Sequence, residues 1–353
     1  MKISCNKPHF HTCHCTFIPP SVLDNMARKG ISNTISTIQD SKIKREKRER
    51  RVNSELEFFS TASGENAERI VYDSKGTWEQ RVEKVLQEGE DPANQDESVG
   101  NAYDFSGKVR DYFKNSLGRD SIDDAHMDII LNVHYGQNYN NAFWDGDEMT
   151  FGDGDNVMFT DFSKSLDVVA HELTHGVTQW AANLEYRGQS GALNESFSDV
   201  FGTVITQNAQ GQTADDADWL IGDEIMGPEL QGEALRSMIE PGTAYDNDIM
   251  GKDPQPSHMD SYYSGSGDNY GVHINSGIMN KVFYLAAKEF EIGTERSGLI
   301  WYDALLNLWP TANFNDASTI LVESAIKLTL QNKVPKGSPQ KIRAALKRVG
   351  LPR

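Results

Sequence analysis

The sequence predicts an α+β protein of two lobes, the first rich in strands and the second mainly helical. Its 353 residues exceed what a single hydrophobic core usually organises, so two lobes are expected. Residues 68–162 mix short strand-like runs with turn residues and one helical stretch. Between residues 301 and 350 the apolar residues follow helical spacing, with no chemical motif among them, which is typical of a scaffold.

Local signals predict the elements of the amino-terminal part. Ser21 follows two prolines and precedes apolar residues at helical spacing, so it is expected to cap a helix over residues 21–28. Residues 41–51 are densely charged and have little to bury, which favours a solvated helix or a linker. Residues 104–117 are predicted to be helical, and residues 127–135 to form a strand.

The later elements are predicted in the same way. A strand is expected at residues 140–144, directly before a turn. Apolar helices are expected over residues 168–177 and 191–202. An acidic, loop-rich stretch over residues 211–247 separates them from a further apolar helix over residues 278–290.

Charge excludes two classes of partner. The net charge of −18 argues against binding to nucleic acid and to anionic membrane surfaces. The first 60 residues are nevertheless basic overall, so this segment could dock electrostatically on the acidic remainder.

Cysteine placement and apolar runs bear on the compartment. All three cysteines fall within the first fifteen residues, so no disulfide braces the main body. No apolar run is long enough to span a bilayer. The first residues lack the continuous apolar segment of a secretory signal, and we therefore expect that any export uses another route.

The helix predicted over residues 168–177 carries a metal-binding motif. His171 and His175 are four residues apart, so their imidazoles lie on one face and can converge on a single ion. Zn²⁺ accepts neutral imidazole readily. Glu172 points about 100° away around the helix, which suits a base acting on the metal-bound water better than a ligand.

The next helix offers the third ligand that a catalytic zinc site requires, since such a site takes three protein ligands and leaves one position to water. Glu195 and Asp199 are four apart and share a face. If this helix packs on the first, Glu195 reaches the metal. Asp199 then lies one turn further on, where it can accept a hydrogen bond from a ligating histidine and orient its ring.

These motifs, together with residues 140–144 and 271–277, resemble the thermolysin-like (M4, gluzincin) neutral metalloendopeptidases. The resemblance runs from about residue 70 to the C-terminus. It implies a two-lobe fold with one catalytic zinc ion in the cleft between the lobes. We expect a propeptide over residues 1–53, a catalytic lobe over 54–182 and a helical lobe over 183–353.

The resemblance also implies roles for further residues. Imidazolium is a good donor to the oxyanion of a tetrahedral intermediate, so His273, oriented by Asp268, is expected to act there with Tyr186. Arg236 matches an arginine that binds the substrate carbonyl just past the scissile bond. Asn141 and the backbone of Ala142 match a strand edge that pairs with bound peptide. The matching specificity pocket is apolar, which predicts cleavage on the amino-terminal side of bulky hydrophobic residues; its residues are Phe159, Phe162, Val168 and Leu235.

The segment Pro19-Pro20-x-x-Leu23 resembles the short propeptide of protealysin-like precursors. This implies an intramolecular inhibitor laid across the cleft and removed by a cut in the exposed region between residues 41 and 66. As a sharper hypothesis, the thiolate of Cys13 or Cys15 takes the open zinc position in the precursor. The alternative is that these cysteines pack or remain free.

Calcium and partners complete the expectations. The family's calcium cluster matches Asp167, Thr206, Asp218, Leu220 and Asp223. Two of these positions are not carboxylates, so at most one weakened calcium site is expected. The partners implied are peptide and protein substrates, with the chain a monomer. The family suggests secretion by a leaderless route, and cytoplasmic residence is the alternative.

Two other classes of function stay open at this point. One is an inactive homologue that binds zinc and serves as a binding or regulatory protein, which the presence of Glu172, Tyr186 and His273 disfavours. The other is a purely structural zinc site, which is disfavoured because such sites are usually closed by four protein ligands.

Overall fold

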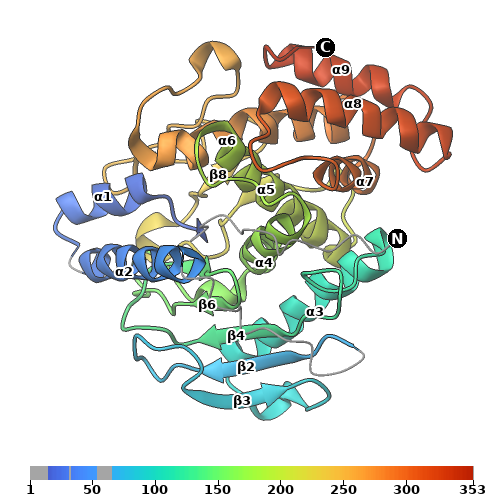
Figure 1. The fold of residues 1–353 in the computed structure, drawn as a ribbon. Coiled ribbons are helices and arrows are strands. Elements are labelled where there is room, and N and C mark those ends of the chain that lie inside the picture. The colour runs from blue at the N-terminus through green and yellow to red at the C-terminus, as the bar shows by residue number, and fades with distance from the viewer. Residues whose placement is uncertain (1–14, 32, 54–65, 353) are drawn as a thin grey trace.

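A computed structural model describes residues 15–31, 33–53 and 66–352. A mixed sheet lies at one end of the molecule, the later helices cover the other end, and the two long helices α4 (Leu166–Ala181) and α5 (Gly188–Gln210) run between them (Figure 1). This arrangement confirms the predicted α+β class with a strand-rich first lobe and a helical second lobe. Among the described residues, no helix combines the length and apolar character needed to cross a membrane.

The main sheet has six strands in the order β1-β5-β6-β4-β2-β3. The β2–β4 and β4–β6 pairs are parallel and the others are antiparallel. The strands are β1 (Cys15–Thr16), β2 (Arg69–Asp73), β3 (Glu83–Gln87), β4 (Ile129–Val133), β5 (Ala142–Trp144) and β6 (Met149–Phe151). One edge strand of the sheet is therefore β1, which belongs to the amino-terminal segment and pairs with β5. The strands expected at residues 127–135 and 140–144 are confirmed in shorter form.

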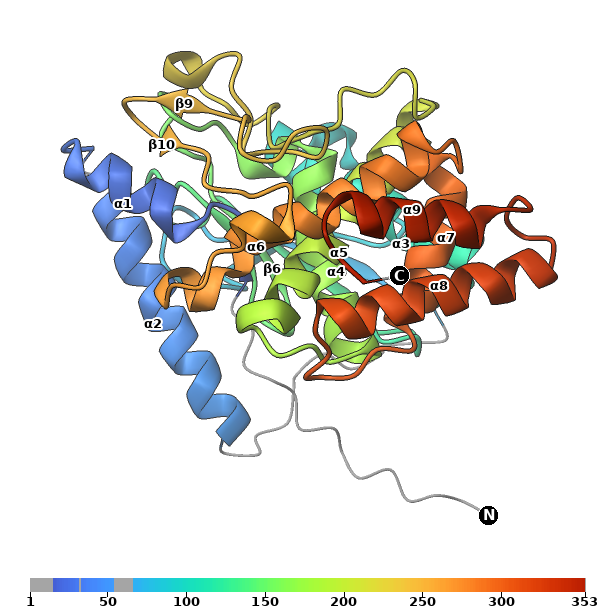
Figure 2. The same ribbon diagram turned by 90° about the horizontal axis from the view of Figure 1, so that it is seen from above.

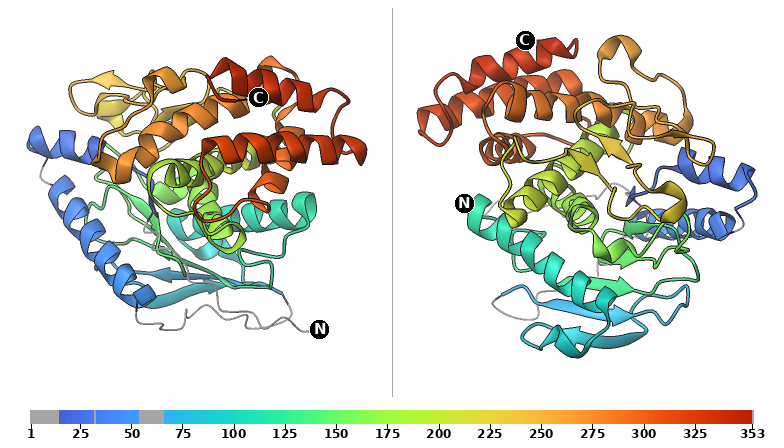
Figure 3. Two further views of the ribbon diagram at one scale, coloured as in Figure 1. Left: turned by 45° about the horizontal axis from the view of Figure 1, so that its top comes forward. Right: turned by 180° about the vertical axis from the view of Figure 1, so that it is seen from behind.

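Helix α3 (Glu97–Leu117) packs on β2 and β4 (Figure 3). It begins earlier than the predicted residue 104, because the Asp96 side chain accepts from the Val99 N–H and caps the helix. It ends at Gly118, which adopts a left-handed conformation (φ 72°). The capping residue thus sets the start of α3, although the apolar pattern of its first turns is weak.

Two helices belong to the amino-terminal segment, α1 (Pro20–Arg28) and α2 (Asn33–Asn53), and both lie along one side of the molecule (Figure 2). The prediction that Ser21 caps α1 was wrong: Pro19 occupies the capping position and Pro20 the first helical position. Helix α2 confirms a helix over residues 41–51. Its Lys44 is buried, however, so the expectation that this run buries little was wrong at that position.

Helices α4 and α5 are buried over most of their length. Small residues lie where other segments pack closely on these two helices: a Cβ on Gly176 would lie 2.7 Å from Ile122 Cγ2, and one on Gly191 would lie 2.4 Å from Val272 Cγ1. Both helices confirm the predictions and extend beyond the predicted limits. The side chains of the metal-binding motif are therefore enclosed by protein. A motif that arose by chance on a charged helix would instead lie on a face exposed to solvent.

The second lobe consists of helices with short strand pairs. Helix α6 (Gly267–Tyr284) starts with four residues in the left-handed region, Asp268 to Gly271. It continues into a π-helical turn, Leu285–Glu289, so it starts earlier than predicted and includes His273. The remaining elements are β7 (Leu220–Ile221), β8 (Arg236–Ser237), β9 (Asp246–Asn247), β10 (Gly251–Lys252), α7 (Thr294–Leu305), α8 (Phe314–Leu330) and α9 (Ser338–Arg348).

Candidate active site

The packing of α4 against α5 brings three ligand side chains together. The Nε2 atoms of His171 and His175 lie 3.1 Å apart. The carboxylate of Glu195 lies 3.5 Å from each of these nitrogens, through one oxygen to each ring. All three side chains are buried.

Hydrogen bonds orient both imidazole rings. The Nδ1 of His171 lies 2.8 Å from Asp199 Oδ1, and the Nδ1 of His175 lies 2.8 Å from Asn194 Oδ1. Each Nδ1–H therefore donates, and each Nε2 points its lone pair at the same place. Two lone pairs this close repel unless a positive species lies between them. A carboxylate beside two imidazoles is a donor set that fits a divalent cation such as Zn²⁺.

Glu172 lies beside this set and is fully buried. Its Oε2 accepts from the Trp144 N–H at 2.9 Å, and its Oε1 has no hydrogen-bond partner among the described residues. Its carboxylate offers an atom within 4.8 Å of ligand atoms of His171 and His175. Burial raises the pKa of Glu172 to about 8, and a cation on the histidines would lower it. A carboxylate with one oxygen anchored and the other open is arranged as a base.

His273 and Tyr186 lie beside Glu195 of the same group. His273 Nδ1 lies 2.6 Å from Asp268 Oδ1, and its Nε2 lies 3.1 Å from the Tyr186 hydroxyl. The Tyr186 hydroxyl donates to Glu195. Burial disfavours the charged form of His273, but Glu195 and Asp268 outweigh it and raise its pKa to about 9. His273 is thus a charged donor whose partners set its direction.

Arg236 is buried and has two polar partners in the part of the chain that the structure describes. Its Nη2 lies 2.9 Å from Asp199 Oδ1, and its Nη1 donates to the Phe17 carbonyl at 3.3 Å. Asp199 also accepts from Asn280 Nδ2 at 2.8 Å. The prediction placed Asp199 beside a histidine, and the structure adds that the same carboxylate balances the buried guanidinium.

The amino-terminal segment runs past these residues in an extended conformation. The Phe17 N–H donates to the Ala142 carbonyl at 3.0 Å, and the Ile18 N–H donates to Asn141 Oδ1 at 2.9 Å. The Thr16 carbonyl lies 3.2 Å from His273 Nε2. Two peptide groups in succession therefore meet the side chains and the strand edge predicted to hold a substrate.

The Phe17 side chain is fully buried next to the ligand histidines. Its ring centre lies 5.1 Å from that of His171, and Arg236 Cζ lies 4.8 Å from it. Gly222, at φ +74°, leaves room for it: a Cβ there would lie 3.0 Å from Phe17 Cε1 and 2.9 Å from Leu235 Cδ1. The side chains of Phe17 and Leu235 therefore both pack against Gly222.

The other residues of the predicted specificity pocket are Phe159, Phe162 and Val168, and all are fully buried in the same core. The Phe159 and Phe162 rings lie 5.9 Å apart. Val168 stands on α4, one turn before His171. An apolar pocket lined by these residues would therefore be continuous with the hydrophobic core around α4, the helix that bears His171 and His175.

The predicted cysteine ligand is contradicted at Cys15. Its sulfur is in a disulfide, so it is not a thiolate. Cys15 is buried in a small cluster with Tyr186 and Val272. Cys13 lies outside the described residues.

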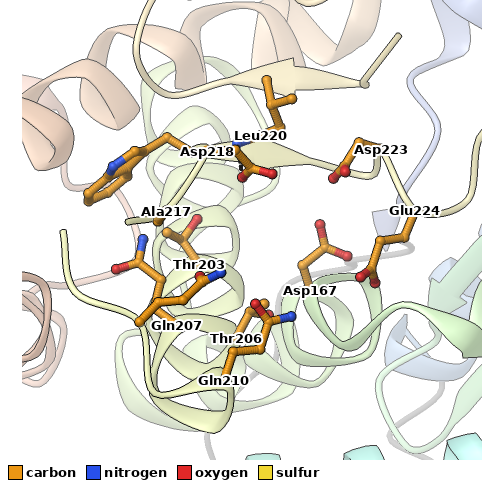
Figure 4. Close-up of a pocket in the computed structure, with 12 residues that line it drawn as sticks. Asp167, Thr203, Thr206, Gln207, Gln210, Ala217, Asp218, Leu220, Asp223 and Glu224 are labelled. Carbon is orange, nitrogen blue, oxygen red and sulfur yellow. Dashed lines mark hydrogen bonds between the residues drawn. The ribbon is translucent and has the colours of Figure 1, made fainter. Parts of the chain in front are cut away.

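The positions predicted for calcium line a cavity of about 90 Å³ beside α5 (Figure 4). Asp167 already accepts from the Ser165 hydroxyl and, at 2.7 Å, from the Gly222 N–H. Burial raises the pKa of Asp223 to about 6, and Asp167 and Asp218 add to the effect. Carboxylates converge here, but Thr206 offers only a hydroxyl. The donor set fits the expected weakened site, and calcium itself stays a prediction.

Several residues of the site were not predicted. Asn194, which orients His175, directly precedes Glu195 and so points about 100° away from it around α5; only the packing of α5 on α4 shows that it reaches His175. The Trp144 N–H that anchors Glu172 and the Phe17 ring on His171 carry no sequence signal, because both contacts join distant segments. The sequence also predicted that Lys44 is exposed to solvent, whereas it is buried.

Comparisons with known proteins agree with this geometry. Residues 28–179 match the family model described as thermolysin metallopeptidase, catalytic domain, and residues 182–351 match the model for its alpha-helical domain. The "Extracellular metalloprotease" of Pectobacterium carotovorum subsp. carotovorum is 43% identical over 301 residues, which is 82% of this chain and 84% of that protein. "Protease PrtS" of Photorhabdus sp. (strain Az29) is 41% identical, over 82% of this chain and 80% of its own.

Two further comparisons extend the pattern. "Thermolysin" of Alicyclobacillus acidocaldarius subsp. acidocaldarius is 42% identical over 67% of this chain but only 42% of its own, longer sequence. Among solved structures, "Precursor of Protealysin, Metalloproteinase from Serratia proteamaculans" superposes with a TM-score of 0.82 at 37% identity. It covers 96% of this chain and 100% of that one.

Proposed function

Since the chain belongs to the thermolysin metallopeptidase family and is a zinc metalloendopeptidase, we propose that it is made as a latent precursor and cuts peptide bonds on the amino-terminal side of bulky hydrophobic residues. The observation that carries this proposal is the binding of residues 16–18 in the cleft. These residues meet the strand edge, the arginine and the histidine as a peptide substrate would.

We assign the zinc ligands to His171, His175 and Glu195. The short Nε2–Nε2 distance and the two Nδ1 acceptors support the histidines. Glu195 is preferred to Glu172 as the third ligand, since its oxygens face both rings while one oxygen of Glu172 is held by a backbone N–H. Zinc bound in this position supplies Lewis acidity that acidifies water and polarises a peptide carbonyl.

The chain's own groups supply the proton transfers and the stabilisation of charge. Glu172 accepts a proton from the attacking water at its open oxygen and passes it to the leaving amine. His273, held by Asp268, and Tyr186 donate to the oxygen that becomes negative. The position of the Thr16 carbonyl, 3.2 Å from His273 Nε2, supports the assignment of His273.

The proposed preference for hydrophobic residues is supported by the position of Phe17. If the Thr16 carbonyl stands where the scissile carbonyl of a substrate would stand, Phe17 is the residue just after the bond. Its buried ring, with Leu235 beside it across Gly222, supports an apolar pocket for that residue. The Arg236 contact to the Phe17 carbonyl supports the role given to this arginine.

The same contacts support latency. A segment that fills the cleft in the manner of a substrate excludes other peptides, so residues 1–53 act as an intramolecular inhibitor until a cut frees them. Residues 54–182 and 183–353 are then the catalytic and helical lobes. We further propose that the mature enzyme is a monomer and acts outside the cell, as the name of the Pectobacterium relative states for that protein. The leaderless route of export stays a prediction.

The test combines zinc content with hydrolysis, before and after removal of the amino-terminal segment, for the full-length chain and its Glu172→Gln variant. We expect about one zinc per chain in both proteins, as one catalytic site requires. After activation, the variant should be slower by about 10²-fold to 10⁴-fold. Peptides with Phe or Leu after the bond should be cut faster than those with Gly or Asp. A fully active Glu172→Gln enzyme would overturn the base, and equal rates for all four peptides would overturn the pocket.

A further inference from the structure

A charged side chain of the amino-terminal segment is buried away from the zinc ligands. Lys44, on α2, is only 9% exposed. Its Nζ donates to Gln80 Oε1 at 2.8 Å, and it lies 4.9 Å from the ring centre of Tyr135 and 5.8 Å from that of Phe143. Burial lowers its pKa, while the carboxylates of Asp40 and Asp145 oppose this effect. A helix that served only as a solvated linker would not bury an ammonium group.

The groups around Lys44 form a site on the catalytic lobe, called here the lysine socket and made of Gln80, Tyr135, Phe143, Asp145 and Glu148. They come from the loop after β2, the end of β4, strand β5 and the β5–β6 turn. Two aromatic faces, an amide oxygen and two carboxylates are the groups that recognise an ammonium ion.

The lysine socket is held in shape by the catalytic lobe itself. Gln80 Nε2 donates to Asp145 Oδ2 and to Thr150 Oγ1, each at 3.0 Å, so its oxygen is left to face Lys44. The Tyr135 ring packs edge-on against Phe143, with centres 5.6 Å apart. Because these contacts do not involve α2, the lysine socket should persist when α2 leaves.

The lysine socket keeps its own two carboxylates when Lys44 leaves. Glu148 is paired with Arg81 at 2.9 Å, and its other neighbour is the amide of Asn132. Asp145 accepts from the neutral amide of Gln80. In the precursor, Asp40 of α2 also faces Tyr135, whose hydroxyl donates to it at 3.0 Å. Removal of α2 therefore takes away Lys44 and Asp40 together, while Asp145 and Glu148 stay with the catalytic lobe.

The lysine socket adjoins the substrate cleft through Phe143. In the β1–β5 pair, Phe143 stands directly opposite Thr16, so their side chains are on the same face of the sheet. Thr16 carries the carbonyl that lies beside His273. One ring thus borders both the amino-terminal side of the cleft and the position of the Lys44 ammonium.

We propose that in the activated enzyme the lysine socket becomes a substrate subsite, which binds a lysine side chain on the amino-terminal side of the scissile bond. Lys44 occupies it in the precursor. The inference rests on the proposed function, because it requires that α2 leave on activation. It adds a second determinant of specificity to the apolar pocket, on the opposite side of the bond.

One experiment measures substrate preference in enzyme activated from the full-length precursor. Peptides with Phe after the bond carry Lys or Gln at each of the three positions before it. At one position Lys should raise kcat/KM by about tenfold over Gln, the size expected for a desolvated cation–π contact. Gln80→Leu should bring this ratio close to one, whereas Gln87→Leu on the distant strand β3 should keep it. A ratio near one at all three positions in the wild type would overturn the proposal.

A second experiment needs no hydrolysis. In the full-length chain, Lys44→Ala should lower the thermal midpoint, and added n-butylammonium should raise it again by filling the lysine socket. Neutral n-butanol should not do so, and neither the wild type nor Lys42→Ala, an exposed change on the same helix, should respond to the amine. Lys44→Met, which keeps the apolar stem, serves if the alanine variant does not fold. Equal effects of amine and alcohol on these variants would overturn the proposal.

The two experiments separate this inference from the proposed function. If the activated enzyme cut none of the peptides, the proposed function would fail, while the thermal response to the amine would still decide whether the lysine socket binds a cation. If it cut the Phe peptides without regard to lysine, only the subsite would fail.

Discussion

Replacing Phe17 with alanine is expected to abolish most of the latency of the precursor. The Phe17 ring is fully buried and lies against His171, Arg236 and Gly222. Truncation of a buried phenylalanine to alanine costs about 3–5 kcal/mol in protein cores. The backbone contacts of residues 16–18 remain in the variant, so the whole loss falls on the side chain.

Loss of that energy shifts the equilibrium between the docked and the undocked segment. Each 1.4 kcal/mol changes an equilibrium constant about tenfold, so the undocked and active fraction should rise by about 100-fold to 4,000-fold until all molecules are active. Ile43→Ala is the matched control, since Ile43 is an apolar residue of the same segment with half of its surface exposed. It should leave latency within about twofold of the wild type.

The assay is the initial rate of peptide hydrolysis by the intact full-length chain, with mass spectrometry to establish that it is still uncut. Each rate is divided by the rate of the same preparation after activation, which corrects for misfolded protein and for zinc content. If intact Phe17→Ala is as latent as the wild type and Ile43→Ala, Phe17 does not hold the segment in the cleft and the reasoning is refuted.

Three further outcomes are expected. Asn194→Ala removes the acceptor of His175 Nδ1 and should weaken zinc binding about 10-fold to 100-fold in a chelator competition; unchanged affinity would contradict the role of Asn194. Asp153→Asn removes the carboxylate that, with burial opposing it, raises the pKa of His134 to about 9. Because this folded-state pKa lies above the unfolded value of 6.5, the pair stabilises the fold below about pH 6.5, and the effect is lost as pH rises through about 9. The variant should therefore lose on the order of 1 kcal/mol of unfolding free energy near pH 6 and almost none near pH 10, measured in urea, and an equal loss at both would refute the assignment. Gly152→Ala would place a Cβ 2.0 Å from a backbone carbonyl oxygen, so its thermal midpoint should fall by several degrees, and an unchanged midpoint would contradict the close packing.

Each of these changes has a control of the same chemical type. Asn208→Ala lies exposed on α5 and should not alter zinc affinity. Asp104→Asn is exposed on α3 and should not change the pH dependence of stability. Gly100→Ala, where an added Cβ meets no atom within 4 Å, should leave the midpoint unchanged or raise it.

The zinc ligands and their immediate neighbours could be predicted from local spacing. His171 and His175 lie one helical turn apart, as do Glu195 and Asp199, and a helix converts that spacing into a shared face whatever surrounds it. The pair of helices needed only to pack together, and their apolar residues required that they be buried. The Asp268 contact to His273 was predictable for a similar reason, since the two residues are close in the chain.

The sequence by itself determined the two-lobe class, the metal-binding motif and the helices that carry it, because these depend on periodicity over a few turns. Only the tertiary structure decided that Phe17 enters the cleft, that a Trp144 N–H anchors Glu172 and that Lys44 is buried rather than solvated. Each of these contacts joins segments that are far apart in sequence, and a side chain's local pattern is the same whether or not a distant surface covers it. Burial of a charge in particular depends on partners from several elements at once, and no short stretch of sequence contains them.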